Sequence, residues 1–348
     1  MSDHPIPIDW FDYDLPSDLI AQHPIEPRDA ARLLVVDRAS ATFSDRMFRD
    51  LPDLLNPGDL IVVNDTRVLP ARLFARRPTG GQVELLLLGR NADGAWQALG
   101  RPARRMRAGE RLALLDSRGD VTNDRVEVVG RDGEQVLVRF DDERAIERDG
   151  RVPLPPYIHE HLDDPERYQT VYARETGSSA APTAGMHFTP EVIARCEARG
   201  VRLASITLHV GLGTFQPIKT ADARDHQMHA EVYSVSPETV ETIRATRATG
   251  GRVLAVGTTS VRTLETVAGS VLAPDPAGLL AGATRLYITP GRPFALVDLM
   301  LTNFHLPRTT LLLLVAAFAG DDLMRRAYAH AIAERYRFYS FGDAMLIV

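Results

Sequence analysis

Short apolar runs separated by turn sequences fill the stretch from about Leu73 to Phe140. Runs such as "QVELLLLG", "RLALLD" and "QVLVRF" alternate with "PTGG", "NADG" and "GRDGE". Turns rich in Gly, Asp and Asn at this spacing, with no helical period between them, are typical of antiparallel strands joined by hairpins. This stretch therefore predicts a small antiparallel β-sheet or barrel.

Helical and strand patterns alternate in the rest of the chain. Residues 189–200, "TPEVIARCEARG", have Thr as N-cap, Pro at the first helical position and Gly after the last, and the apolar "VRLASITLHV" follows. Residues 236–250 have the same arrangement, with Ser as N-cap, Pro next and Gly at the end, before the apolar "RVLAVG". Such alternation predicts a mainly parallel sheet, so we predict the α/β class. A large mixed α/β domain (residues 1–66 and 151–348) would carry an inserted small antiparallel β-barrel domain (residues 67–150).

Composition narrows the possible functions. A net charge of −6 over 348 residues gives no global attraction to nucleic acid or to an anionic membrane, so any RNA contact must be local. One cysteine, Cys196, excludes an intramolecular disulfide and a multi-thiolate metal site. The first residues lack a signal-peptide pattern, and the apolar run 311–320 is too short to span a bilayer. We therefore expect a soluble, cytoplasmic protein.

The stretch "RVLAVGTTSVRTLE" (252–265) has an apolar strand that runs directly into a helix. The unpaired N–H groups of a first helical turn suit a carboxylate or phosphate, and an arginine one turn later adds positive charge. An ordinary N-cap would have the same sequence. The residues predicted here to bind substrate are Gly257, Thr258, Thr259, Ser260 and Arg262.

Two further stretches place polar residues beside turns. Residues 168–192, "YQTVYARETGSSAAPTAGMHFTPEV", form a long segment of small residues, and residues 299–310, "LMLTNFHLPRTT", pass from a strand into a Pro turn. Small residues allow close approach of backbone to a ligand, and α/β sheets bind ligands beyond the carboxyl ends of their strands. Capped structural loops remain the alternative. The predicted substrate-binding residues are Thr183, Gly185 and Phe188 in the first and Thr302 and Asn303 in the second.

The stretch "TLHVGLGTFQPI" (207–218) begins like a dinucleotide-binding motif but lacks its third glycine and its helix. We interpret it as a tight turn at a strand end, beside a pocket. Its predicted substrate-binding residues are Gly211, Gly213, Thr214 and Phe215.

Histidine suits proton transfer near neutral pH, which makes His187, His209 and His305 the catalytic candidates. Asp65 and Glu231 are alternatives, although Asp65, in "VNDTRV", could equally form a structural pair with an arginine. "DHQMHAEVY" (225–233) contains two histidines without the other ligands of a zinc motif, so we predict no metal.

Residues 101–111, "RPARRMRAGER", form the most basic stretch. It could contact a phosphate backbone, or it could be an ordinary solvated surface. The arginines predicted to make a nucleic-acid contact are Arg101, Arg104, Arg105 and Arg107.

Taken in order, these stretches resemble one family, the S-adenosylmethionine:tRNA ribosyltransferase-isomerases of queuosine biosynthesis. "FDYDLPSDLIAQHP", "PGDLIVVNDTRVLPARL" and "RFYSFGDAMLI" extend the resemblance almost from end to end. Gln216 departs from the family pattern, in which arginine is common at that position. A charged contact to an anion is therefore not expected at that position.

The resemblance implies a cytoplasmic monomer without metal, with S-adenosylmethionine as a co-substrate and no other cofactor. It implies transfer and isomerisation of the ribosyl moiety of S-adenosylmethionine onto 7-aminomethyl-7-deazaguanine at the tRNA wobble position. The products would be epoxyqueuosine-tRNA, adenine and methionine. Two alternatives stay open: an S-adenosylmethionine-dependent RNA methyltransferase, which would normally have a GxGxxG motif, and a non-catalytic RNA-binding module, which would be expected to have a stronger basic face.

Overall fold

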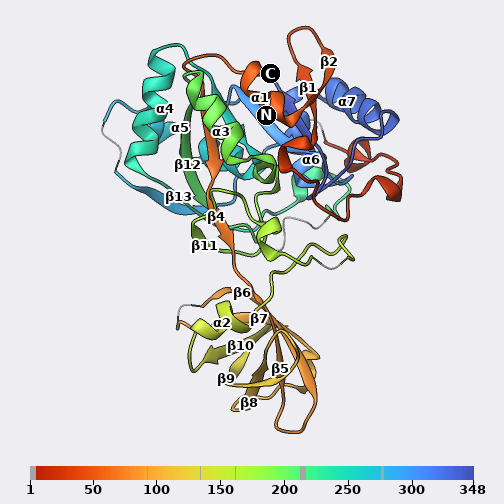
Figure 1. Ribbon diagram of the computed structural model, residues 1–348, viewed down its shortest axis with the longest axis vertical. Helices are drawn as coiled ribbons and strands as arrows, with labels where there is room; N and C mark the ends of the chain where they lie inside the picture. Colours follow the sequence, from red (N-terminus) through yellow and green to blue (C-terminus); the bar gives the residue numbers. More distant parts are fainter. Residues whose placement is uncertain (1–4, 92, 134, 161, 212–216, 276–277) are drawn as a thin grey trace. The chain divides into compact units, whose positions relative to one another are not determined.

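The computed structural model describes residues 5–91, 93–133, 135–160, 162–211, 217–275 and 278–348 (Figure 1). The chain divides into two compact units. The α/β unit contains Met1–Thr66, Pro156–Glu175 and Pro182–Val348, and the barrel unit contains Arg67–Pro155 and Thr176–Ala181. The predicted fold class, α/β with an antiparallel barrel, is confirmed.

The described part of the α/β unit is built on a nine-stranded sheet in the order β15-β13-β12-β3-β14-β16-β17-β1-β2. Its strands are β1 (Arg32–Asp37), β2 (Thr42–Met47), β3 (Leu60–Asn64), β12 (Arg202–Leu208), β13 (Glu231–Val235), β14 (Val253–Val256), β15 (Leu280–Thr284), β16 (Leu299–Asn303) and β17 (Ala344–Ile347). The neighbours β12, β3, β14 and β16 are parallel, so their carboxyl ends lie at one edge of the sheet. Every residue of β3, β14 and β16 is buried, as in strands covered on both faces.

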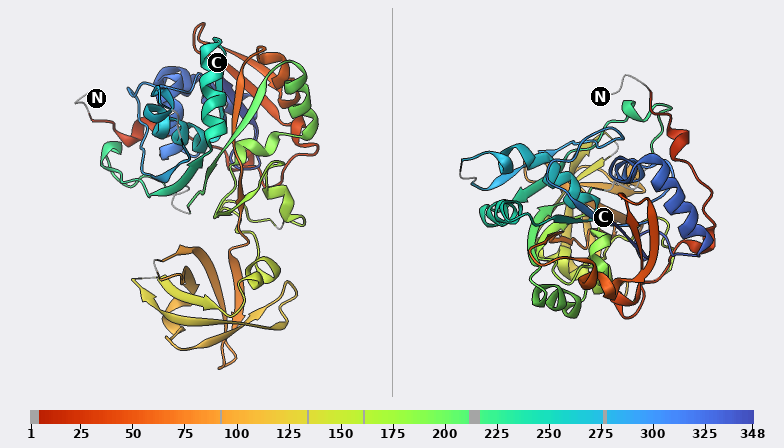
Figure 2. Two further views of the ribbon diagram at one scale, coloured as in Figure 1. Left: turned by 90° about the vertical axis from the view of Figure 1, so that its left-hand side faces the viewer. Right: turned by 90° about the horizontal axis from the view of Figure 1, so that it is seen from above.

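Helices cover both faces of this sheet (Figures 1 and 2). They are α1 (Leu51–Leu54), α3 (Pro190–Ala198), α4 (Pro237–Ala248), α5 (Gly257–Leu272), α6 (Thr310–Ala319) and α7 (Asp321–Ala333). On one face, side chains of α1 and α3 share an apolar core with Ile61, Val63 and Leu254. On the other, α5 packs against β3, β14 and β16.

The helix starts predicted at 189 and 236 are confirmed. The Thr189 hydroxyl accepts a hydrogen bond from Val192 N, and the Ser236 hydroxyl accepts one from Thr239 N. The described 3₁₀-helices are η1 (Ile8–Phe11), η2 (Ser17–Leu19), η3 (Arg28–Ala30), η4 (Phe48–Asp50), η5 (Ala103–Arg105), η6 (Pro165–Tyr168), η7 (Thr183–His187) and η9 (Ala223–Asp225).

The barrel unit is a closed barrel in the order β10-β7-β6-β5-β8-β9, with antiparallel neighbours throughout the pairs described. It comprises β5 (Arg72–Arg76), β6 (Gln82–Arg90), β7 (Trp96–Arg101), β8 (Arg111–Leu115), β9 (Val121–Asp132), β10 (Gln135–Phe140) and the helix α2 (Arg144–Asp149). Buried residues alternate along β6, as expected for a barrel filled by side chains. A two-stranded sheet of β4 (Thr66–Val68) and β11 (Glu175–Ser178) lies where the chain passes between the units.

Candidate active site

Asn64, the last residue of β3, connects three of the elements that meet at the carboxyl edge of the sheet. Its amide nitrogen donates to Leu208 O at 3.0 Å and to Thr259 Oγ1 at 3.1 Å, and its amide oxygen accepts from Leu208 N at 3.0 Å. The ends of β3 and β12 and the first turn of α5 are thereby fixed together. Asn64 is not among the predicted site residues, although it lies beside the candidate Asp65 in "VNDTRV".

The first turn of α5 is buried against this edge. Gly257 has φ of +83°, which favours glycine, and a Cβ there would lie 3.7 Å from Ala184 Cβ of η7. Thr258, Thr259 and Ser260 are buried, and Ser260 Oγ donates to Val256 O at 2.8 Å. No side chain caps this helix, so its first-turn amides remain suited to a ligand, and the predicted anion contact stays a prediction.

Arg262 and Glu231 form an ion pair in which each side chain is 4% exposed. Glu231 also accepts from Gly211 N at 3.0 Å, and Arg262 Nε donates to Leu286 O at 3.1 Å. The guanidinium predicted to attract an anion therefore already faces a carboxylate. The geometry supports a structural role for the pair, in which Glu231 holds the backbone of Gly211 and Arg262 holds Glu231, while the roles of both residues toward substrate stay predictions.

A second connection joins η7 to the end of β16. Thr183 Oγ1 donates to Asn303 Oδ1 at 3.0 Å, and Asn303 Nδ2 donates to Tyr339 O at 3.2 Å. A Cβ at Gly185 would lie 2.0 Å from the Tyr172 hydroxyl, so glycine is required there for close packing. Phe188, predicted to bind substrate, lies wholly buried in the apolar core and packs against Phe48 at a ring distance of 5.1 Å.

In two of the three candidate histidines, His187 and His305, the Nε2 atom contacts an oxygen of the protein. His187 is buried, with Nδ1 3.1 Å from Ala184 O and Nε2 3.0 Å from Gly342 O. Nε2 of His305 lies 2.7 Å from Thr302 Oγ1, and burial lowers the pKa of His305 to about 3. Burial also lowers the pKa of His187. Both imidazoles are therefore kept neutral and are held within the protein.

His209 is half-buried, like His305, whereas His187 is buried. Nδ1 lies 2.8 Å from Thr66 Oγ1, and Nε2 has no hydrogen-bond partner in the part of the chain that the structure describes. Burial lowers the pKa of His209, and the nearby carboxylates of Glu175 and Asp65 partly oppose that shift.

Asp65 directly follows the end of β3, and its side chain has different partners from that of Asn64. Its Oδ1 accepts from Thr207 Oγ1 at 2.7 Å and its Oδ2 accepts from Arg174 at 2.8 Å, which makes Arg174 a structural partner of this carboxylate. Asp65 also lines a cavity of about 840 Å³. The other residues lining that cavity are Val63, Val171, Tyr172, Ala173, Arg174, Glu175, Leu203, Ala204, Ser205, Thr207, Ser234, Ser236, Glu238, Thr239, Thr242 and Leu279.

Part of the predicted site cannot be placed. Gly213, Thr214, Phe215 and the divergent Gln216 lie outside the described residues. In the described ranges, no group of three or more His, Cys, Asp or Glu side chains could hold a metal ion. No helix in those ranges is long and apolar enough to cross a membrane.

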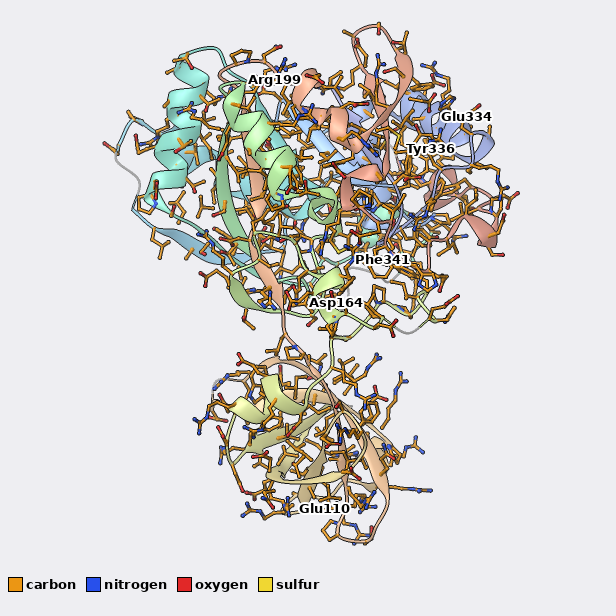
Figure 3. All side chains as sticks on the ribbon, viewed as in Figure 1. Glu110, Asp164, Arg199, Glu334, Tyr336 and Phe341 are labelled. Atoms are coloured by element: carbon orange, nitrogen blue, oxygen red, sulfur yellow. The ribbon has the colours of Figure 1, made fainter. Side chains whose placement is uncertain are left out.

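The four arginines predicted to bind tRNA lie on β7, η5 and the turn that follows, and all four are exposed. No ion pair involves any of them among the residues that the structure describes. The neighbouring Arg77, by contrast, pairs with Glu110 at 2.7 Å. Figure 3 labels Glu110 and shows nitrogen-tipped side chains on the surface of the barrel unit.

The fold is an α/β sheet with polar side chains gathered at the carboxyl ends of its parallel strands, which is where α/β proteins typically bind small molecules. The family described as "Queuosine biosynthesis protein" matches residues 8–347. A protein of Symbiobacterium thermophilum named S-adenosylmethionine:tRNA ribosyltransferase-isomerase is 54% identical over 341 residues, 97% of this chain and 98% of its own length. One of the same name from Thermotoga petrophila is 50% identical over 339 residues, with the same coverage of both chains.

Among solved structures, S-adenosylmethionine tRNA ribosyltransferase from Thermotoga maritima is similar, with a TM-score of 0.57 and 40% identity. The match covers 97% of this chain and all of that one. The present chain therefore belongs to the queuosine biosynthesis protein family. The family, the enzyme class and the biosynthetic function predicted from the sequence are confirmed at this level.

Proposed function

We propose that this chain transfers the ribosyl moiety of S-adenosylmethionine to 7-aminomethyl-7-deazaguanine at the wobble position of tRNA and isomerises it to the epoxycyclopentanediol of epoxyqueuosine. Adenine and methionine are the other products. The observation that carries the proposal is the convergence of polar groups from separate sequence stretches at one sheet edge, in a chain about half identical to relatives named for this activity.

The chemistry requires little covalent participation by the protein. The positive sulfur of S-adenosylmethionine acidifies the adjacent 5′-carbon of the ribose, so a base can remove a proton there. The aminomethyl nitrogen of the tRNA base then acts as the nucleophile. This agrees with a chain in which Lys219 is the single lysine and Cys196, the single cysteine, is buried. Burial raises the pKa of the Cys196 thiol to about 11, which keeps it un-ionised and a poor nucleophile.

The proposed tRNA contact is the exposed face of Arg101, Arg104, Arg105 and Arg107. Because the net charge is −6, attraction to a phosphate backbone must come from a local surface of this kind. We further propose a cytoplasmic monomer that uses neither a metal nor a cofactor besides its co-substrate. The inserted barrel domain at residues 67–150 would supply the RNA-binding surface, and the α/β domain would supply the chemistry.

Product analysis tests the proposal. The protein is incubated with S-adenosylmethionine and tRNA that carries 7-aminomethyl-7-deazaguanine, and the small molecules are separated. Equal release of adenine and methionine is expected. Formation of S-adenosylhomocysteine would instead identify an RNA methyltransferase, and tRNA binding without turnover would favour the non-catalytic module.

A further inference from the structure

His209 differs from the other two candidate histidines at Nε2. This nitrogen has no hydrogen-bond partner in the described ranges of the chain, whereas Nε2 of His187 lies 3.0 Å from Gly342 O and Nε2 of His305 lies 2.7 Å from Thr302 Oγ1. A catalytic base must reach the proton that it removes, directly or through one water. The half-buried ring of His209 can therefore meet a substrate without a rearrangement of the core, which the buried His187 cannot, and His305 is a much weaker base because burial lowers its pKa to about 3.

Thr66 contacts the other ring nitrogen of His209, Nδ1. Thr66 is fully buried, and its own N–H donates to Asn64 Oδ1 at 3.2 Å, so its position is fixed by the strand-end network. The Thr66 hydroxyl donates to the carbonyl of Glu175 at 3.4 Å, and a carbonyl oxygen can only accept. Thr66 Oγ1 also lies 2.8 Å from His209 Nδ1, and a hydroxyl that donates to Glu175 O can only accept at this contact, from Nδ1–H. Nε2 then keeps its lone pair.

The surrounding charges suit a base that becomes positive as it reacts. The charged groups that act on His209 are the carboxylates of Glu175 on β11 and Asp65 at the end of β3, and both raise its pKa. Burial acts more strongly in the opposite direction, so the resting imidazole is neutral near pH 7. The same carboxylates stabilise the imidazolium once a proton arrives.

We infer that Nε2 of His209 removes the ribose C5′ proton of S-adenosylmethionine and that Thr66 is a positioning residue that fixes the required tautomer. In this step the C5′–H bond breaks, its electron pair stays on C5′ beside the positive sulfur, and Nε2 gains the proton. The catalytic part of this inference rests on the proposed function. The tautomer of His209 does not, and can be measured separately.

Three variants test the inference. Thr66→Val keeps the shape of the side chain and removes the hydroxyl, Thr66→Ser keeps the hydroxyl, and His209→Gln removes the titrating group. Single-turnover adenine release should fall about 100-fold or more in His209→Gln. It should fall roughly tenfold in Thr66→Val, with the KM for S-adenosylmethionine unchanged, and it should stay near the wild-type rate in Thr66→Ser. Thermal melting of each variant checks that it has folded.

The pH profile separates catalysis from structure. Since the base must be unprotonated, wild-type kcat/KM should rise with pH and level off, with a midpoint below the ordinary histidine pKa of about 6.5. That acidic limb should be absent in His209→Gln. Persistence of the limb in a folded His209→Gln variant, or equal rates in Thr66→Val and wild type, would overturn the inference.

A spectroscopic measurement keeps the tautomer testable without turnover. In ¹⁵N spectra of histidine-labelled protein at neutral pH, His209 should have a protonated Nδ1 and an unprotonated Nε2, and Thr66→Val should lose this preference. A wild-type protein with the proton on Nε2 would refute the role of Thr66. If the tautomer is as expected but the wild type releases no adenine, the proposed function and the catalytic role fail together and the positioning by Thr66 stands.

Discussion

The two ends of the central parallel strands use polar residues differently. At the amino ends of β3 and β14, the Asp59 carboxylate accepts from the backbone N–H groups of Asn56 and Arg252 and from the Arg252 guanidinium, at 2.6 to 3.2 Å. The backbones approach closely there, since a Cβ at Gly251 would lie 2.2 Å from Gly58 O. Each of these groups is used to join one segment of the protein to another.

At the carboxyl ends the polar side chains are also held, but groups remain for a ligand. Asn64 and Thr66 fix their neighbours in place, while in the described part of the chain His209 Nε2 has no hydrogen-bond partner and no side chain caps the start of α5. Networks in which every hydrogen-bonding group has a partner stabilise a fold, whereas groups in fixed positions that still have an unused donor or acceptor are prepared for binding. The difference indicates that substitutions at the amino ends should change stability and those at the carboxyl ends should change catalysis.

The largest effect on stability is expected for Gly251→Ala. Its new methyl group would meet Gly58 O and also Thr246 Cγ2, at 2.9 Å, so the backbones must separate at a cost of about 3 kcal/mol. Urea denaturation measures the change. The matched control is Gly269→Ala in the exposed part of α5, where no atom lies within 4 Å, and it should stabilise by about 1 kcal/mol. Equal effects of the two substitutions would contradict the close approach at Gly251.

A smaller and pH-dependent effect is expected for Asp59→Asn. Burial raises the pKa of Asp59, but hydrogen bonds from Arg252 and from the backbone N–H groups outweigh it and hold the folded-state pKa below its ordinary value. The charged form therefore stabilises the fold above the unfolded pKa of about 3.9, and this contribution disappears as the pH falls through the lower folded pKa. Asp59→Asn should cost about 2 kcal/mol at pH 7 and progressively less below about pH 4. A difference from wild type that is independent of pH would exclude this electrostatic origin.

The smallest effect is expected in the barrel unit, on the affinity of the exposed arginines for tRNA. Reversal of Arg104 and Arg105 to Glu should weaken tRNA binding roughly tenfold and reduce the slope of log K against log salt by about one to two. The control is Arg118→Glu, an exposed arginine in a turn of the same barrel and outside the arginine cluster. Filter binding over a salt series measures both variants, and identical slopes would remove the proposed RNA contact from this face.

Local features were predictable from the sequence, and long-range pairings were not. The caps at Thr189 and Ser236, the hairpins of the barrel and the strand-to-helix turn at Gly257 are fixed within a few residues, where short-range sterics and hydrogen bonds decide the structure. Phe188 was predicted to bind substrate because it follows a long segment of small residues. In the structure its side chain is wholly buried in the apolar core. An apolar residue has no sequence signal that separates these two uses.

The site network depends on contacts between distant parts of the chain. Thr66 and His209 are 143 residues apart, and Arg174 lies 109 residues from Asp65. These contacts follow from the order of strands in the sheet, which no local pattern determines. Arg262 was predicted as an anion contact from its position in α5, but its pairing with Glu231 follows from the place of β13 in that order. Sequence patterns therefore pointed to residues at the carboxyl edge but did not reveal that two of them, Arg262 and Glu231, form an ion pair with each other.

A structure of the protein with S-adenosylmethionine bound tests the central claim most directly. The claim is that the chemistry takes place at the carboxyl ends of β3, β12 and β14. We predict that the ribose C5′ lies within hydrogen-bonding reach of His209 Nε2, directly or through one water, with the ligand against the first turn of α5. Binding of S-adenosylmethionine wholly within the cavity lined by Ser205, Ser234 and Thr239, with C5′ remote from His209, would contradict it.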